Sequence, residues 1–304
     1  MSASFTDRDV PDQSGRTALV TGANTGLGYE TAKVLAARGA RVLLACRTET
    51  KALEAMARIE AEVPNADLVF VPLDLGDLSS VRALVPLVEK EDRLDLLINN
   101  AGIMMPPYGV TVDGFETQFG VNHLGHFALT GLLLPLLDAG SNGRVVTVSS
   151  LAHTGGRIFW DDLQAEQKYG ATARYGQSKL ANLLFMRELD RRLRAADSST
   201  ISVGCHPGIA DTELSRYFPK PLMLFAPLTR GFFNTAAQGA WPTLMAATAP
   251  DVEGGQYFGP SKRRQTAGPA RRVGSSARSK DRDLARRLWD VSIELTGVDP
   301  GLDV

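Results

Sequence analysis

Short apolar runs alternate with longer amphipathic segments along most of this 304-residue chain. An apolar run of about four to eight residues fits a strand that is buried on both faces, whereas apolar residues about three and four positions apart fit a helix. Elements that alternate in this way build βαβ units wound into a parallel sheet. We therefore expect an α/β fold: a single Rossmann-type, doubly wound parallel sheet of about seven strands with helices on both faces.

The pattern predicts where each element lies. The expected strands are 17–21, 41–46, 67–75, 94–102, 143–150, 200–208 and 254–260. The expected helices are 29–39, 49–63, 77–90, 115–140, a segment through 174–182, and 283–297. The helix at 115–140 is apolar on nearly all sides, so it packs either deep in the domain or against another subunit of a homo-oligomer.

The composition is that of an ordinary globular protein. Hydrophobic residues make up 44% and charged residues 22%, which is enough for a large core. We expect one domain over residues 1–304. The formal net charge of -1 gives no reason to expect a nucleic-acid partner. Cys46 and Cys205 lie in apolar runs far apart in the sequence, which favours reduced core thiols and a cytoplasmic location.

The two ends of the chain differ in character. The amino-terminal residues lack a basic stretch followed by an apolar one, and no uninterrupted apolar run reaches the roughly 18 residues of a membrane span. We therefore expect no span. Residues 262–287 carry ten basic and two acidic residues, which predicts a mobile basic surface loop near 261–280 before a C-terminal helix. A contact site for an anionic partner or a membrane surface is the alternative.

The segment TGANTGLG at 21–28 lies between the first expected strand and the first helix. Glycines there let the backbone approach the pyrophosphate of a dinucleotide, and the amides and dipole at the helix start stabilise its charge. Gly22, Gly26 and Gly28 fit the general G-x-G-x-x-G fingerprint only loosely. A tight turn that serves packing alone would also need glycine.

Arg47 follows the second expected strand, where the adenosine ribose of a dinucleotide binds. An acidic residue here would repel a 2′-phosphate, whereas a guanidinium attracts it. We therefore expect NADP(H) as the preferred cofactor, with NAD(H) also able to bind. An exposed arginine without function is the alternative.

Together with further motifs, this turn resembles the short-chain dehydrogenase/reductase family over about residues 15–260. The further motifs are Asp74-Leu75, NNAG at 99–102, Asn122 in VNHLGHF, the set Ser150, Tyr175 and Lys179, and HPGIADT at 206–212. The wording of the motifs, including YGQSKLANLLF, is most similar to the retinol-dehydrogenase-like branch. That branch also carries an insertion between the serine and the tyrosine, so we expect 153–173 to arch near the active-site mouth.

The resemblance implies a set of site residues. It implies a catalytic tetrad of Asn122, Ser150, Tyr175 and Lys179. It implies cofactor contacts from Gly22, Asn24, Thr25, Gly26, Leu27, Gly28, Arg47, Asp74, Leu75, Asn100, Ala101, Gly102, Tyr175, Lys179, Pro207, Gly208 and Thr212. Among these, Asp74 and Leu75 would meet the adenine, Lys179 the nicotinamide ribose, and Thr212 the carboxamide.

Tyr175 and Lys179 lie four residues apart in an expected helix, so their side chains share one face. Reduction of a carbonyl needs a hydride on carbon and a proton on oxygen. A phenol, whose usual pKa is about 10, supplies that proton more readily when a neighbouring ammonium stabilises its anion. We therefore expect Lys179 to lower the pKa of Tyr175. Taken alone, the pair would also fit an ordinary helix surface.

Ser149 and Ser150 are neighbours in a strand, so only one of them faces the substrate. By motif position we choose Ser150, which would hold the substrate oxygen beside the tyrosine. Asn122 would hold a water on a proton path, or satisfy the backbone of a kinked helix, or both. His123 and His126 lack a nearby carboxylate or cysteine, so we expect no metal site.

The segment YFPKPLMLFAPLTRGFF at 217–233 falls where the family places its substrate lid, near 209–235. With IMMPPY at 103–108 it predicts an apolar pocket for a small lipophilic aldehyde, ketone or alcohol. Core or oligomer packing explains the same residues equally well.

The chain is thus expected to be an NADP(H)-dependent oxidoreductase that interconverts a lipophilic ketone or aldehyde and its alcohol, with Tyr175 as general acid/base. A regulatory protein that binds the nucleotide without catalysis is the alternative, although such proteins usually lose the tyrosine or the lysine. A sugar-nucleotide epimerase or dehydratase shares the tyrosine–lysine pair, but NNAG and the limited C-terminal portion argue against it.

Overall fold

Eight strands form one sheet in the computed structural model, which describes residues 4–140, 142–209 and 234–302. The strand order is β3-β2-β1-β4-β5-β6-β7-β8, and all neighbours are parallel except β7 and β8. The strands are β1 Thr17–Thr21, β2 Arg41–Cys46, β3 Leu68–Pro72, β4 Leu96–Asn99, β5 Arg144–Val148, β6 Ile201–Cys205, β7 Tyr257–Lys262 and β8 Ala267–Arg272. The chain reverses direction across the sheet between β1 and β4, the kind of point at which doubly wound sheets bind ligands.

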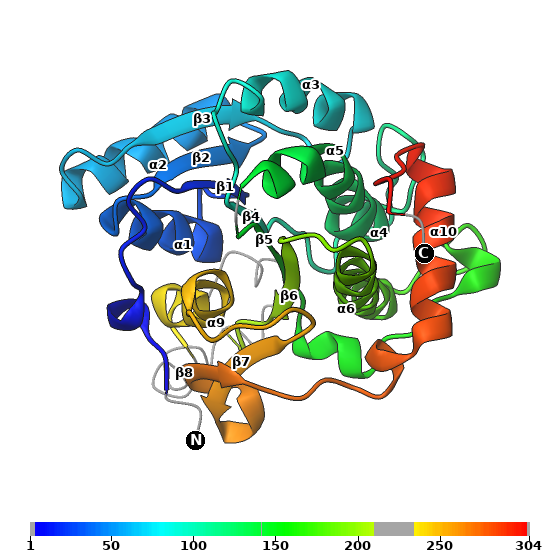
Figure 1. The fold of residues 1–304 in the computed structure, drawn as a ribbon. Coiled ribbons are helices and arrows are strands. Elements are labelled where there is room, and N and C mark those ends of the chain that lie inside the picture. Colours follow the sequence, from blue (N-terminus) through cyan, green and yellow to red (C-terminus); the bar gives the residue numbers. More distant parts are fainter. Residues whose placement is uncertain (1–3, 141, 210–233, 303–304) are drawn as a thin grey trace.

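Helices cover both faces of the sheet (Figure 1). They are α1 Gly26–Ala37, α2 Glu49–Glu62, α3 Leu78–Val88, α4 Thr117–Phe119, α5 Gly125–Ala139, α6 Ala171–Ala195, α9 Ala236–Thr248 and α10 Arg282–Thr296. The apolar residues of α1, α2 and α9 pack in one core layer, and those of α3, α5 and α6 in the layer on the other face. α10 packs against α6. The expected doubly wound α/β fold is confirmed.

The prediction of a basic loop near 261–280 is wrong, because this segment contains β8. β8 pairs antiparallel with β7, and Phe5 near the amino terminus bridges to Ala270. Ala270 is fully buried, whereas Arg271 and Arg272 are exposed. An edge strand commonly presents charges to solvent in this way. The many basic residues of this segment therefore suggested a loop where the structure has the eighth strand.

The long apolar helix expected at 115–140 is present, with a π-helical turn at Gly120–Leu124 between α4 and α5. By length and composition, Thr117–Ala139 is the one helix in the described ranges that could cross a membrane. However, 78% of its most apolar window is buried inside the protein. Of the two packing arrangements considered for this helix, the structure therefore shows the one deep within its own chain.

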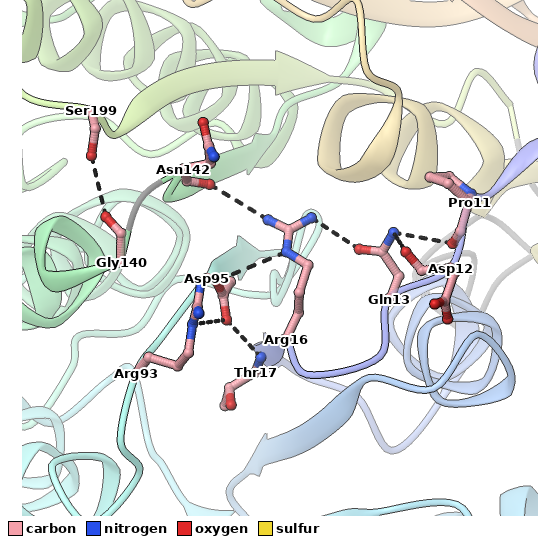
Figure 2. Close-up of polar contacts among 10 residues, drawn as sticks. All are labelled: Pro11, Asp12, Gln13, Arg16, Thr17, Arg93, Asp95, Gly140, Asn142 and Ser199. Atoms are coloured by element: carbon pink, nitrogen blue, oxygen red, sulfur yellow. Dashed lines mark hydrogen bonds and ion pairs between the residues drawn. The ribbon is translucent and has the colours of Figure 1, made fainter.

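The amino-terminal edge of the sheet is closed by a polar network around Asp95 (Figure 2). Asp95 is 1% exposed. Its carboxylate accepts hydrogen bonds from the Thr17 N–H at 2.8 Å and from Arg93 Nε at 3.0 Å, and it lies 3.9 Å from Arg16 Nε. This network ties the start of β1 to the start of β4, at the edge of the sheet opposite the sequence motifs.

Candidate active site

The motifs gather along one edge of the sheet. Parallel strands end at the same edge, and most motifs follow a strand end. Asn122, Tyr175 and Lys179 instead lie on helical segments. The residues that directly follow β1 to β6 are Gly22, Arg47, Leu73, Asn100, Ser149 and His206. The fold therefore brings the described candidate residues into one region.

The turn after β1 has the backbone that a dinucleotide site requires. Gly22 has a φ of 66° and Gly26 a φ of 57°, left-handed values that favour glycine. A Cβ at Gly28 would collide with the Gly22 carbonyl and the Asn100 side chain. α1 begins at Gly26, so the first amides of the helix and its positive dipole end face out of the turn. These features fit the pyrophosphate of NAD(P).

The NNAG segment is fastened to β1 through Thr21. Thr21 Oγ1 accepts hydrogen bonds from the N–H groups of Asn100 and Ala101, both at 2.9 Å. Asn100 Nδ2 donates to the Thr21 carbonyl at 2.8 Å, so this side-chain amide binds the last residue of β1, just before the glycine turn. A Cβ built on Gly102 would lie 3.2 Å from Asn122 Oδ1 and 3.3 Å from Lys179 Nζ. Glycine at this position lets those two side chains approach the strand end.

Arg47 lies at the exposed rim of the site. Its side chain is 75% exposed, and its Nη1 lies 3.9 Å from Asp74 Oδ2. The other Asp74 oxygen accepts from the Gly76 N–H at 2.9 Å. Leu75 is buried in the core. An exposed guanidinium one strand away from the glycine turn fits a 2′-phosphate, although Asp74 would compete for it.

Tyr175, Ser150 and Lys179 meet beside the end of β5. Tyr175 and Lys179 are both buried on α6, and Lys179 Nζ lies 5.7 Å from the centre of the tyrosine ring. The ammonium also donates to the Val148 carbonyl at 3.3 Å. The Ser150 side chain lies close enough to the Tyr175 hydroxyl to lower the pKa of that phenol. A proton donor, its hydroxyl partner and a buried cation therefore share one place.

Burial dominates the electrostatics of this group. It raises the pKa of Tyr175 above its usual 10.0, and the neighbouring Ser150 side chain opposes the rise. Burial also lowers the pKa of Lys179 to about 8, opposed by the Cys205 thiol. The net shift of the Tyr175 pKa is therefore upward, because burial outweighs the effect of Ser150. The lowering expected from Lys179 stays a prediction.

Ser149 and Ser150 have different surroundings. Ser149 is buried, and its Oγ donates to the Lys179 carbonyl at 2.7 Å, which anchors β5 to α6. Ser150 is partly exposed, and its Oγ accepts from the Ala152 N–H at 3.2 Å at the start of a short 3-10 helix. The structure places Ser150, and not Ser149, beside the Tyr175 hydroxyl.

Asn122 lies in the π turn and is fully buried. Its Oδ1 accepts from the Ile103 N–H at 2.8 Å, and its Nδ2 donates to the Ile103 carbonyl at 2.9 Å and to Ser178 Oγ at 3.0 Å. The amide thus satisfies backbone groups of the loop after β4, and not those of its own helix.

The loop after β6 is supported by the β7–β8 hairpin. Gly208 has a φ of 77°, and the Thr266 carbonyl lies too close to leave room for a Cβ there. Asn234 Nδ2 donates to the Pro207 carbonyl at 3.3 Å, and its Oδ1 accepts from the Gly268 N–H at 2.9 Å. The hairpin, whose second strand was not expected from the sequence, therefore holds the Pro207-Gly208 segment.

The insertion at 153–173 packs against the apolar segment 103–108. The Tyr169 hydroxyl donates to the Pro106 carbonyl at 2.5 Å, and the rings of Tyr169 and Tyr108 meet edge-on with centres 5.4 Å apart. The insertion therefore lies beside the loop that follows NNAG.

Two clefts of about 680 and 690 Å³ open beside α6 and the β7–β8 hairpin. Arg187 and Lys280 line both, and no residue of the tetrad lines either. The expected substrate lid near 209–235 lies outside the described residues except for its ends, and so does Thr212.

The helical histidines have protein partners. His123 Nε2 lies 3.0 Å from Ser292 Oγ, and the His123 ring packs close to Phe119 and Phe185. His126 lies between Thr21 and the Asn122 backbone. Over the described ranges, no group of three or more metal-ligating side chains occurs.

The fold and this arrangement define a class of oxidoreductase. Residues 16–221 match the model of the short chain dehydrogenase family, and the chain belongs to this family. It is an NAD(P)-dependent oxidoreductase that acts on alcohol and carbonyl groups.

Comparisons with individual proteins agree with this family assignment. Retinol dehydrogenase 12 of Mus musculus is 45% identical over 289 residues, which cover 93% of this chain and 87% of that protein. An uncharacterised protein from Mycobacterium paratuberculosis has a crystal structure that is 43% identical, with a TM-score of 0.82 over 99% of this chain and 100% of that one. A structure described as an NAD(P) dependent gluconate 5-dehydrogenase from Beutenbergia cavernae, with NADP at low occupancy, is 25% identical, with a TM-score of 0.66 over 81% of this chain and 95% of that one. The resemblance to the retinol-dehydrogenase-like branch is confirmed.

Several residues that shape the site were not identified from the sequence. Thr21 joins β1 to NNAG, and Asn234 joins the β6 loop to the hairpin. His206 accepts from the Gly208 N–H through Nδ1 at 3.2 Å. A polar residue at the end of a buried strand was a usable signal for Thr21. Nothing in the local pattern marks Asn234, because its partners are distant in sequence.

Proposed function

We propose that this protein is an NADP(H)-dependent oxidoreductase that interconverts a lipophilic ketone or aldehyde and its alcohol, with Tyr175 as general acid/base. The observation that carries the proposal is that buried Tyr175 lies beside Ser150, with Lys179 over its ring, at the sheet edge that holds the glycine turn. The name of the retinol dehydrogenase relative supports a lipophilic alcohol or carbonyl substrate.

The side chains divide the chemistry of reduction. NADPH, when bound, supplies a hydride to the carbonyl carbon. Ser150 donates a hydrogen bond to the carbonyl oxygen and holds it beside Tyr175. Tyr175 is protonated at neutral pH, since burial raises its pKa, and it can therefore give its proton to that oxygen. In the oxidative direction Tyr175 must first lose this proton, which the raised pKa opposes.

Each polar group of the cofactor has residues in this chain that would bind it. The amides of the turn at Gly22, Gly26 and Gly28 would hold the pyrophosphate, and Arg47 the 2′-phosphate. Lys179 is mostly protonated at pH 7, because its pKa is about 8, and it would donate to the nicotinamide ribose. Two buried free cysteines support a cytoplasmic location, which cell fractionation would test.

Turnover by the purified protein tests the proposal. With a panel of lipophilic aldehydes and ketones, we expect NADPH to be consumed with a higher kcat/KM than NADH. The substitution Tyr175→Phe removes the transferable proton and should lower kcat at least about 100-fold while NADPH still binds. Tyr169→Phe, in the insertion, is the matched control and should retain most activity. Undiminished turnover by Tyr175→Phe would refute the assigned role, and NADPH binding without turnover of any compound would favour a regulatory protein.

A further inference from the structure

His126 touches two parts of the candidate site, the end of β1 and the π turn, although no motif role is assigned to it. It lies in the first turn of α5, directly after the π turn that holds Asn122, and it is 1% exposed. Its Nε2 lies 2.9 Å from Thr21 Oγ1, and its Nδ1 lies 3.1 Å from the Asn122 carbonyl oxygen. Both ring nitrogens therefore have fixed partners.

The partners determine which nitrogen carries the proton. A carbonyl oxygen only accepts, so Nδ1 carries the hydrogen and donates to Asn122. Nε2 is then an acceptor, and the Thr21 hydroxyl donates to it at 2.9 Å, since the other acceptor within reach, the Ile98 carbonyl, is farther away at 3.3 Å. Thr21 Oγ1 accepts in turn from the N–H groups of Asn100 and Ala101. Burial lowers the pKa of His126 to about 4, so the ring is neutral at pH 7.

The Asn122 carbonyl that His126 contacts lies within the π turn. In this turn the Gly125 N–H donates to the Gly120 carbonyl, so the backbone pairing departs from the α-helical pattern. The side chain of Asn122 is already committed to Ile103. The hydrogen bond from His126 is therefore a separate restraint on the backbone of the same turn.

We propose that His126 is a positioning residue whose neutral Nδ1–H imidazole holds the π turn against the end of β1, so that Asn122 and Lys179 keep a fixed position relative to the cofactor turn. The inference rests on the proposed function, because it concerns how those two residues are placed. Gly102 gives the link to the lysine, since both Asn122 Oδ1 and Lys179 Nζ lie against this glycine.

Two substitutions separate the two hydrogen bonds of the ring. In His126→Asn the amide nitrogen takes the place of Nδ1 and can still donate to Asn122. In His126→Gln the longer side chain reaches the place of Nε2 and can pair only with Thr21. We expect kcat of the Asn variant to stay within about 3-fold of wild type and kcat of the Gln variant to fall roughly 30-fold, because misplaced catalytic groups cost rate steeply. The Kd for NADPH should change less than about 3-fold in both.

His123→Gln is the matched control, because His123 is equally buried three positions earlier but pairs with Ser292 of α10. Its amide can keep the bond to Ser292, but the ring packing against Phe119 and Phe185 is lost, so it should lower Tm and leave kcat per folded enzyme unchanged. If the Gln variant of His126 behaves in the same way, its role is structural only and the proposal fails.

Nitrogen NMR of the histidine-labelled protein gives a readout that does not depend on turnover. The resonances lost in His126→Gln should show the Nδ1–H tautomer. His123 should show the Nε2–H tautomer, because Ser292 Oγ already donates to the Leu288 carbonyl at 2.7 Å and can only accept from the ring. An Nε2–H tautomer at His126 would overturn the proposal. An inactive wild-type protein would contradict the proposed function alone, and the tautomer would still decide this inference.

Discussion

At the level of single residues, Lys179 illustrates a conflict between stability and function. Its pKa falls from 10.5 to about 8 on burial, so below about pH 8 the folded protein carries a charge that the interior disfavours. A shift of this size corresponds to a cost on the order of 3 kcal/mol in the free energy of unfolding. The fold tolerates the cost because the lysine lies beside the tyrosine and the strand end that form the candidate site.

Arg47→Asp tests the cofactor preference at this scale. The substitution replaces an exposed cation by a carboxylate that repels a 2′-phosphate and can bond ribose hydroxyls. We expect kcat/KM with NADPH to fall roughly 100-fold and kcat/KM with NADH to change less than about 3-fold, as measured by steady-state kinetics with both cofactors. Lys90→Asp, an equal charge change at an exposed position after α3, should leave both values unchanged. An unaltered NADPH-to-NADH ratio in Arg47→Asp would remove Arg47 from cofactor recognition.

At the level of elements, the two edges of the sheet have different tasks. The carboxyl edge collects the glycine turn, NNAG and the tetrad, whereas the amino edge carries the network around Asp95 (Figure 2). The β7–β8 hairpin extends the sheet and braces the loop after β6 through Asn234. Stability and activity should therefore respond separately to substitutions at the two edges.

Asp95→Asn should lower stability without changing activity. An amide cannot replace the charge that Arg93 and Arg16 face, and it offers one fewer acceptor oxygen beside the Thr17 N–H. We expect the free energy of unfolding to fall by about 2 kcal/mol, with kcat/KM within about 2-fold of wild type. Urea unfolding measures the first quantity and steady-state kinetics the second. Asp92→Asn, at an exposed neighbouring position, should change stability by less than about 0.5 kcal/mol. A large loss of activity in Asp95→Asn would contradict this division of the sheet.

At the level of the whole molecule, buried neutral histidines link stability to pH. Burial lowers the pKa of His123 from 6.5 to about 3, and the pKa values of His126 and His206 from 6.5 to about 4. The unfolded chain binds protons at these positions below about pH 6.5, whereas the folded protein does not. Stability is therefore fully present above pH 6.5 and is lost as the pH falls toward about 4.

The free energy of unfolding should fall steeply with acid. Three protons taken up on unfolding give a slope of about 4 kcal/mol per pH unit near pH 5. The loss between pH 6.5 and pH 5 is about 5 kcal/mol, because the slope is only about half as large at pH 6.5. This is comparable to the whole stability of a typical domain, so we expect acid unfolding near pH 5. Urea titrations from pH 7.5 to 5 measure the slope. His123→Phe removes one titrating ring and should reduce the slope by about a third. A flat profile over this range would contradict the neutral, buried state of these histidines.

Local patterns in the sequence were sufficient for the order of strands and helices, the α/β class and the place of most motifs at strand ends. They were also sufficient to put Tyr175 and Lys179 on one helix face. These features depend on residue periodicity and on the shared direction of parallel strands, and both can be read along the chain. The eighth strand was missed, because on an exposed edge its charges and glycine gave it the composition of a loop.

Only the tertiary structure decided which side chains meet and how much water they retain. It placed Ser150 beside Tyr175, showed that burial raises the pKa of that tyrosine, and brought Thr21 to His126 across 105 positions of sequence. The physical reason is that hydrogen-bond partners and desolvation depend on distances between segments remote in sequence. No local pattern contains those distances.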